Sequence, residues 1–167
     1  MMSITEQDLI KHCLAGNRKA YDEFYRFYSA RLYGICLRFA ATVANIDDAV
    51  EVLNGFLRAR QLGPVLFDVE LLAREAFLNA VLHGCGGDAG RFVQAELRVL
   101  DDRLTLRVED DGPGFDWRKA LAAAPAMPDT ERGRGLFILK SYADELAFSS
   151  LGNALCITKR LAPKETT

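Results

Sequence analysis

Apolar residues recur at every third or fourth position in five stretches of the chain, a spacing that predicts amphipathic helices. The stretches cover residues 9–14, 21–32, 46–57, 72–80 and 136–146. Ser3 and Glu6 form a capping box ahead of the first stretch, Gly16 ends it, and Asn17 can cap the next. The first two helices are therefore expected to form a hairpin.

Strict alternation of apolar and polar residues predicts strands in other parts of the chain. Residues 93–99 and 104–108 alternate on either side of Asp101-Asp102, and strands near 147–150 and 155–160 flank Gly152-Asn153. Each pair is expected to form an antiparallel hairpin. Residues 32–41 fit either a continuing helix or a strand.

Capping and turn residues set the boundaries of the middle helices. Asn45 is expected to cap the third helix, and the Leu-Gly-Pro sequence at 62–64 is expected to end it. The fourth helix is expected to begin near Asp68 and to end at Gly84.

The segment between residues 115 and 131 is rich in Ala and Pro and weakly patterned, which predicts a mobile loop. Trp117 lies in this segment and is expected to pack as part of a lid. Helices that alternate with antiparallel strand pairs predict the α+β class. The expected architecture is a two-layer α/β sandwich, in which helices cover one face of a mixed sheet.

Composition narrows the class of protein. The chain has 167 residues and a net charge of −2, which leaves no footprint for direct binding of nucleic acid or of a membrane surface. The four cysteines lie far apart without zinc-ligand spacing, so free buried thiols in a reducing compartment are expected. The acidic, polar N-terminus is unlike a signal peptide, and no apolar run reaches membrane-spanning length. A cytoplasmic protein is expected.

Glu75 and Asn79 lie one helical turn apart, and His83 follows one turn later on the same face. An Asn side chain offers an oxygen to a hard cation such as Mg²⁺, and a Glu can accept a proton from an attacking hydroxyl. An exposed polar pair on an amphipathic helix is the alternative. His83 can face the phosphates of a ligand or cap the helix end, and the second role is favoured.

Asp110 ends a predicted strand and enters the turn Asp-Gly112-Pro-Gly114. Glycines let the backbone approach a ligand closely, and the carboxylate can accept a hydrogen bond from the exocyclic amine of adenine. An ordinary strand-to-loop turn uses the same residue types.

A second glycine-rich segment precedes the last long helix. It consists of Glu131, Arg132, Gly133, Arg134, Gly135 and Leu136. Free backbone N–H groups at a helix N-terminus bind phosphate, and arginines add charged donors. A flexible linker with solvated arginines is the alternative. The sequence contains no Walker loop.

In combination and in this order, the motifs resemble the nucleotide-binding boxes of the GHKL (Bergerat-fold) ATPases. They are Glu75-x-x-x-Asn79-x-x-x-His83-Gly84, Asp110-x-Gly112-x-Gly114-Phe115 and Gly133-x-Gly135-Leu136. Within that superfamily, the short chain and the form Glu-Ala-x-x-Asn-Ala-x-x-His-Gly resemble the anti-sigma-factor serine/threonine kinases. The resemblance covers roughly residues 35–161.

The resemblance implies a pocket for ATP and Mg²⁺ under a lid between Gly114 and Gly133. It implies that Glu75 is the general base, that Asn79 binds Mg²⁺ and that Asp110 holds the adenine amine. The other residues expected to bind nucleotide are His83, Gly112, Gly114, Arg132, Gly133, Arg134, Gly135 and Leu136. The family often has a threonine near adenine in the last hairpin, where this chain has Asn153.

The resemblance also implies a protein kinase that phosphorylates an anti-anti-sigma (antagonist) partner, sequesters a sigma factor and forms a homodimer. One alternative is a non-catalytic nucleotide-gated binding module, in which ATP only switches partner affinity. A sensor histidine kinase is disfavoured, because the only histidines are His12 and His83, and neither lies in a phosphoacceptor-like motif.

Residues 8–33 resemble the first helices of extracytoplasmic-function sigma factors. No DNA-reading region follows them, so the chain is not expected to be a sigma factor. The favoured interpretation is an amphipathic hairpin that packs on the ATPase sheet or builds a dimer interface, and the alternative is a decoy that occupies a sigma-binding partner. The expected organisation is a hairpin appendage at 1–34, a GHKL domain at 35–162 and a tail at 163–167.

Overall fold

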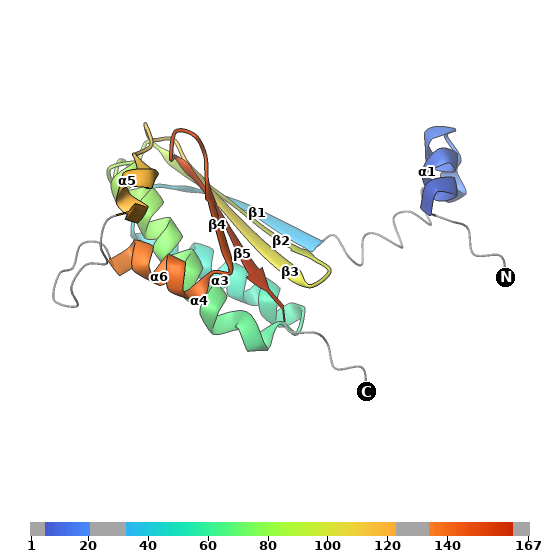
Figure 1. Cartoon of the computed structure of the whole chain (residues 1–167), viewed down its shortest axis with the longest axis horizontal. Helices are drawn as coiled ribbons and strands as arrows, with labels where there is room; N and C mark the ends of the chain where they lie inside the picture. Colours follow the sequence, from blue (N-terminus) through green and yellow to red (C-terminus); the bar gives the residue numbers. More distant parts are fainter. Residues whose placement is uncertain (1–5, 21–32, 123–133, 162–167) are drawn as a thin grey trace.

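The computed structural model describes residues 6–20, 33–122 and 134–161. The described strands form one antiparallel sheet in the order β1-β2-β3-β5-β4. Helices α3, α4 and α6 lie on one face of this sheet, and α1 lies apart from it (Figure 1). The strands are β1 (Tyr33–Ala40), β2 (Phe92–Leu100), β3 (Arg103–Asp110), β4 (Glu145–Phe148) and β5 (Ala154–Arg160). The helices are α1 (Glu6–Leu14), α3 (Ala44–Ala59), α4 (Gly63–Leu78), the π-helical η1 (Asn79–Gly84), α5 (Trp117–Ala122) and α6 (Arg134–Tyr142).

This arrangement confirms the expected α+β sandwich, but the expectation of a mixed sheet is wrong. Two helices, α3 and α4, connect β1 to β2, and each runs along the sheet once. Two helical passes return the chain to the end of the sheet where β1 finished, so β2 runs antiparallel to β1. The ambiguous segment forms strand β1 over residues 33–40, and its alternating apolar residues pack against the helical core.

The central hairpin forms as the alternation predicts. In β2 and β3 every second residue is buried, and Leu97 lies opposite Leu106 across the pair. Asp101 in the connecting turn has a φ of 51°, a left-handed conformation that Asp tolerates better than most residues. The alternation therefore identified both the strands and the face of the sheet that packs on the helices.

Several helix boundaries differ from those expected. Asn45 is not the cap of α3, which begins at Ala44 without a side-chain cap; instead the Asn45 Nδ2 donates to the Ala40 carbonyl at 2.9 Å. Helix α3 ends at Ala59, so the Leu-Gly-Pro sequence at 62–64 does not end it. Gly63 and Pro64 instead begin α4, which was expected to start near Asp68, because a proline in the first helical turn is compatible with a helix start. Leu146 continues the apolar spacing of α6 but belongs to β4.

The main core lies between α3, α4, α6 and the inner face of the sheet. It includes the fully buried side chains Ile46, Leu53, Leu57, Val69, Leu72, Phe77, Leu97, Leu104, Leu106, Leu139 and Ile157. The ring of Phe77 meets that of Phe39 edge-on, with centroids 5.3 Å apart. Helix α4 is therefore fixed against the sheet, which matters because its C-terminal end carries Glu75 and leads into η1.

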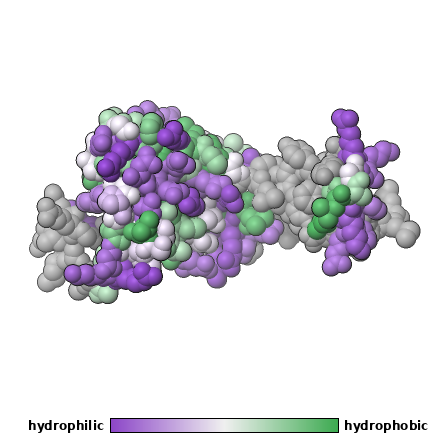
Figure 2. Space-filling model, turned by 90° about the horizontal axis from the view of Figure 1, so that it is seen from above, coloured by the Kyte–Doolittle hydropathy of each residue, from purple (hydrophilic) through white to green (hydrophobic). Residues whose placement is uncertain are grey.

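The outer face of the sheet is polar in the described strands. Arg98 pairs with Glu96 at 2.5 Å, and Arg107 pairs with Glu109 at 2.6 Å. Hydrophilic side chains cover much of the main body as seen in Figure 2. The described helices include none that is both long and apolar enough to cross a membrane.

The described cysteines are free thiols. Cys13 and Cys85 are buried and Cys156 is half-buried, but Cys36 is exposed, so the expectation of buried thiols is wrong for Cys36. Its side chain alternates with the inward-facing residues of β1 and therefore lies on the outer face of the sheet.

The N-terminal region has a small apolar cluster of its own. Leu9, Cys13 and Ala20 form this cluster, which is separate from the main core. Asn17 caps the helical segment that begins at Arg18, as expected, since its Oδ1 accepts from the backbone N–H groups of Lys19 at 3.0 Å and Ala20 at 3.3 Å. Most of the expected second helix, residues 21–32, lies outside the described residues, so the hairpin and its role remain predictions.

Candidate functional site

A cavity of about 380 Å³ lies between η1, the ends of β3 and β5, and the start of α6. Ligand pockets typically measure roughly 300–1,000 Å³, so the cavity has room for a small organic ligand. The expected binding residues that line it are Asn79, His83, Asp110, Gly114, Gly135 and Leu136. Three motifs that lie far apart in the sequence therefore meet around one space.

Three further expected residues, Glu75, Gly112 and Arg134, are described by the structure but lie outside this lining. Gly112 lies behind the carboxylate of Asp110, and Arg134 is an exposed residue at the start of α6. Arg132 and Gly133 lie outside the described residues. Glu75, the expected base, lies beside Gly135.

The helix that carries Asn79 and His83 changes its winding at the cavity. From Asn79 to Gly84 the backbone is π-helical, and the Cys85 N–H donates to the Ala80 carbonyl at 2.7 Å. Such wide turns cost backbone energy and occur frequently at functional sites. The sequence predicted a helix that ends at Gly84, and nothing in its apolar spacing identified the wider turn.

Asp110 lies at one end of the cavity and is only 9% exposed. Its Oδ1 accepts from the Gly112 N–H at 2.8 Å. A Cβ on Gly84 would overlap the Asp110 carboxylate, and a Cβ on Gly112 would overlap the Gly84 carbonyl. Both glycines are therefore needed for the helix end to lie against the strand end, whereas the expected close approach to a ligand stays a prediction.

Burial changes the ionisation of this carboxyl group. Desolvation raises the pKa of Asp110 above its ordinary value of 3.8, and the Gly112 N–H opposes that effect. A buried carboxylate is energetically costly unless its oxygens accept hydrogen bonds. A ligand with an N–H group in the cavity would supply one.

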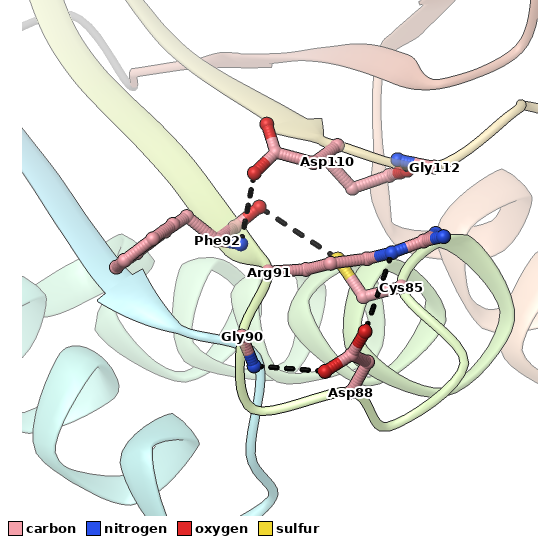
Figure 3. Close-up of polar contacts among 8 residues, drawn as sticks. Cys85, Asp88, Gly90, Arg91, Phe92, Asp110 and Gly112 are labelled. Carbon is pink, nitrogen blue, oxygen red and sulfur yellow. Dashed lines mark hydrogen bonds and ion pairs between the residues drawn. The ribbon is translucent and has the colours of Figure 1, made fainter.

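The neighbouring aspartate, Asp111, holds two strands together. The Phe92 N–H donates to Asp111 Oδ2 at 3.0 Å, which holds the start of β2 to the end of β3. Around it, the Gly90 N–H donates to Asp88 at 2.8 Å and Arg91 pairs with Asp88 at 3.7 Å, in the network of Figure 3. Asp111 is therefore engaged by the backbone, whereas the carboxylate of Asp110 lines the cavity.

At the other end, the first turn of α6 meets the face of α4 and η1. A Cβ on Gly135 would lie 2.9 Å from Glu75 Oε2 and 3.4 Å from Asn79 Oδ1. Burial raises the pKa of the Glu75 carboxyl above 4.5, and the charge of Arg134 lowers it. A carboxylate, an amide oxygen and a helix N-terminus thus lie side by side, a donor set suited to a phosphate group with its cation.

His83 lines the cavity, although its capping role was favoured. Cavity residues that the sequence reasoning missed include Phe148 and Leu155, which lie on β4 and β5. The alternation in these strands could have pointed to them, because the residues that face the helices also face the cavity.

Asn153, where the family has threonine, also lines the cavity. Its Nδ2 donates to the Asp110 carbonyl at 3.3 Å, and its Oδ1 accepts from the Ser149 hydroxyl at 3.0 Å. Both ends of the amide are therefore in use, and the side chain joins the last hairpin to the backbone of Asp110.

The start of the expected mobile loop is ordered differently from the prediction. Residues 117–122 form helix α5, and the rest of the segment to 133 lies outside the described residues. Trp117 stacks on Phe148, with centroids 5.3 Å apart. It therefore packs on β4, beside the cavity.

Comparison with known proteins agrees with this geometry. Residues 39–159 match the family model described as "Histidine kinase-like ATPase domain". The chain is similar to the anti-sigma F factor of Clostridium novyi, with 31% identity over 128 residues, or 73% of this chain and 80% of that protein. It is 32% identical over 136 residues to the anti-sigma F factor of Clostridium acetobutylicum, 75% and 92% of the two chains. It is 30% identical over 102 residues to the serine-protein kinase RsbW of Bacillus subtilis, 56% and 64% of the two chains.

Proposed function

This chain belongs to the histidine kinase-like ATPase family, and we propose that it is an ATP-dependent protein serine/threonine kinase that acts as an anti-sigma factor. The observation that carries the proposal is the meeting of Asn79, Asp110 and Gly135 around one cavity, with Glu75 beside Gly135. The names of the relatives, anti-sigma F factor and serine-protein kinase, support the same activity.

The residues of the cavity fit a nucleotide with Mg²⁺. At one end of the cavity, the Asp110 carboxylate can accept a hydrogen bond from the adenine amine. At the other end, the N-terminus of α6 at Gly135 can hold phosphate. Asn79 Oδ1 is a hard oxygen ligand, and Mg²⁺ typically needs few of these from a protein. The cation would supply charge neutralisation at the phosphates.

Glu75 is the candidate general base. In the proposed reaction its carboxylate takes the proton of a serine hydroxyl on the partner while that oxygen bonds to the γ-phosphorus. The bond from the γ-phosphorus to the bridging oxygen breaks, and ADP leaves. We infer that the charge of Arg134, at the first position of α6, attracts the phosphates.

The proposed partners are an anti-anti-sigma protein, which carries the serine, and a sigma factor that the kinase sequesters in the cytoplasm. We further propose a homodimer. The described part of β1 pairs with β2 on one side, and its other edge has no described strand. An unpaired edge of eight residues is a surface on which a second chain can dock.

Phosphotransfer from radiolabelled ATP to candidate antagonist proteins tests the proposal. Glu75→Ala is expected to retain ATP binding and to lose transfer, since only the base is removed. Glu51→Ala, which removes an exposed glutamate on α3, is the matched control and should transfer at the wild-type rate.

The alternative is a nucleotide-gated binding module, which needs no base. Wild-type transfer by Glu75→Ala would reject Glu75 as the base. If ATP binds and changes partner affinity while the wild-type chain transfers no phosphate, the binding module is the correct function.

A further inference from the structure

Trp117 is the only tryptophan of the chain, and the proposed reaction does not use it. Its half-buried ring lies nearly parallel to that of Phe148, with centroids 5.3 Å apart and planes 14° apart. Phe148 lines the cavity, and Phe115 meets it edge-on at 5.9 Å. Trp117 therefore supports one wall of the cavity from behind.

A chain of hydrogen bonds leads from the same indole to Asp110. The Trp117 Nε1–H donates to the Ser149 carbonyl at 3.0 Å. The Ser149 hydroxyl donates to Asn153 Oδ1 at 3.0 Å, and Asn153 Nδ2 donates to the Asp110 carbonyl at 3.3 Å. The Asp110 N–H donates back to the Asn153 carbonyl at 3.0 Å. Through Ser149 and Asn153, these bonds connect Trp117 to the backbone of Asp110.

Close backbone contact joins the loop after β3 to the turn between β4 and β5. A Cβ on Gly114 would overlap the Leu151 carbonyl, and a Cβ on Gly152 would overlap the Phe115 carbonyl. The Phe115 N–H donates to the Leu151 carbonyl at 3.0 Å. Both glycines have positive φ angles, 78° and 80°, which favour glycine over other residues. These backbone contacts therefore hold the two segments together, and the hydrogen bond from Trp117 to Ser149 adds a further link between them.

We propose that Trp117 is a positioning residue for the base-binding end of the cavity. By holding Phe148 and the β4–β5 turn, it sets the position of Asp110 relative to the wall against which a purine would lie, and so it contributes to selection of adenine. The inference rests on the proposed function, since it requires that the cavity bind ATP.

Trp117 is expected to affect the base-binding end of the cavity and not the phosphate-binding end. Within the described residues, the side chain of Trp117 interacts with Phe148, Ser149 and Arg118 and with none of the phosphate-binding group Glu75, Asn79 and Gly135. Loss of its side chain should therefore weaken interactions of the base and leave interactions of the phosphates unchanged. A general loss of stability would weaken both.

Calorimetric titration of the full chain with Mg²⁺ and three probes tests this separation: ATP, GTP and inorganic tripolyphosphate. Trp117→Ala removes both the stacked ring and the N–H donor, and about tenfold weaker ATP binding is expected. Trp117→Phe keeps a ring but loses the donor, and about threefold weaker binding is expected. Tripolyphosphate affinity should stay at the wild-type value in both variants, and the preference for ATP over GTP should fall.

Phe67→Ala is the matched control, because it removes an exposed aromatic ring at the opposite end of α4 and should leave ATP affinity unchanged. Thermal unfolding of each variant checks that it folds. In the wild-type chain, emission from Trp117 is expected to change with ATP and to stay constant with tripolyphosphate.

Two results would overturn the inference alone. One is wild-type ATP affinity in Trp117→Ala, and the other is an equal loss of ATP and tripolyphosphate affinity. A wild-type chain that binds neither ATP nor tripolyphosphate would instead overturn the proposed function, and the inference with it.

Discussion

The charge of Arg134 is expected to set the pH range over which Glu75 can act as a base. Burial raises the pKa of Glu75, and the positive charge of Arg134 lowers it. A general base acts only when deprotonated, so kcat/KM for phosphotransfer should rise with pH through this pKa. Arg134→Ala removes the lowering influence, and its acid limb is expected at higher pH, whereas Arg134→Lys keeps the charge. Coincident pH–rate profiles for the two variants would contradict the coupling.

The same pKa also affects stability. Because burial raises the folded-state pKa of Glu75 above 4.5, its stabilising contribution is fully present below pH 4.5 and is lost as pH rises through the folded-state value. Glu75→Gln cannot ionise. The free energy of unfolding of the wild type, relative to Glu75→Gln, is therefore expected to decrease from pH 4 to pH 7. Urea unfolding at several pH values measures it, and a constant difference would show that Glu75 is not desolvated.

Gly135 allows the first turn of α6 to approach Glu75 and Asn79. The Cβ of Gly135→Ala would lie 2.9 Å from Glu75 Oε2, so the Glu75 side chain must shift beside the first turn of α6, where phosphate is proposed to bind. ATP affinity is expected to fall about tenfold or more, with little change in thermal stability, because a flexible side chain can give way. Gly55→Ala on α3, where an added Cβ would meet no atom beyond the backbone of its own helix within 4 Å, is the matched control. Equal ATP affinities in the two variants would contradict the proposed phosphate position.

At the next level, Gly112 joins two elements, the end of β3 and the end of η1. A Cβ at this position would overlap the Gly84 carbonyl, and backbone cannot move aside as a flexible side chain can. Gly112→Ala is therefore expected to lower the free energy of unfolding by about 1–3 kcal/mol, the usual cost of overpacking. Chemical denaturation measures this, and an unchanged midpoint would indicate that the two elements are not held together.

Most elements could be predicted because their signal is local. The spacing of Ile46, Val50, Leu53 and Leu57 gave the buried face of α3, and alternation gave β2 and β3. Boundaries failed where one residue serves two patterns. Leu146 continues the helical spacing yet belongs to β4, and Asn45 has the chemistry of a cap yet bonds to the end of β1.

The candidate site was predictable for a different reason, since its motifs require particular residue types at fixed spacing. Glu75, Asn79, Asp110 and Gly135 could be named before their positions were known, and they meet around or beside one cavity. The support behind them could not be named. Trp117 reaches Phe148 across thirty-one positions of sequence, and no local pattern records a contact between α5 and β4.

For the molecule as a whole, the two apolar clusters predict that the N-terminal region and the main body can be separated. Leu9, Cys13 and Ala20 form a cluster apart from the core that fixes the site. Deletion of residues 1–32, which keeps β1 intact, is expected to leave the thermal midpoint and the ATP affinity unchanged. A truncated chain that is unfolded or does not bind ATP would show that the N-terminal region is part of the ATPase domain.

The convergence of Asn79, Asp110 and Gly135 on one nucleotide is tested by calorimetric titration of ATP into the full chain, with and without Mg²⁺. The wild type is expected to bind one ATP per chain, and more tightly when Mg²⁺ is present. Asp110→Asn should weaken binding in both conditions, because the amine of the base loses its charged acceptor. Asn79→Ala should remove only the gain from Mg²⁺. Absence of ATP binding by the wild type, or identical affinities in all three chains, would contradict a nucleotide site in this cavity.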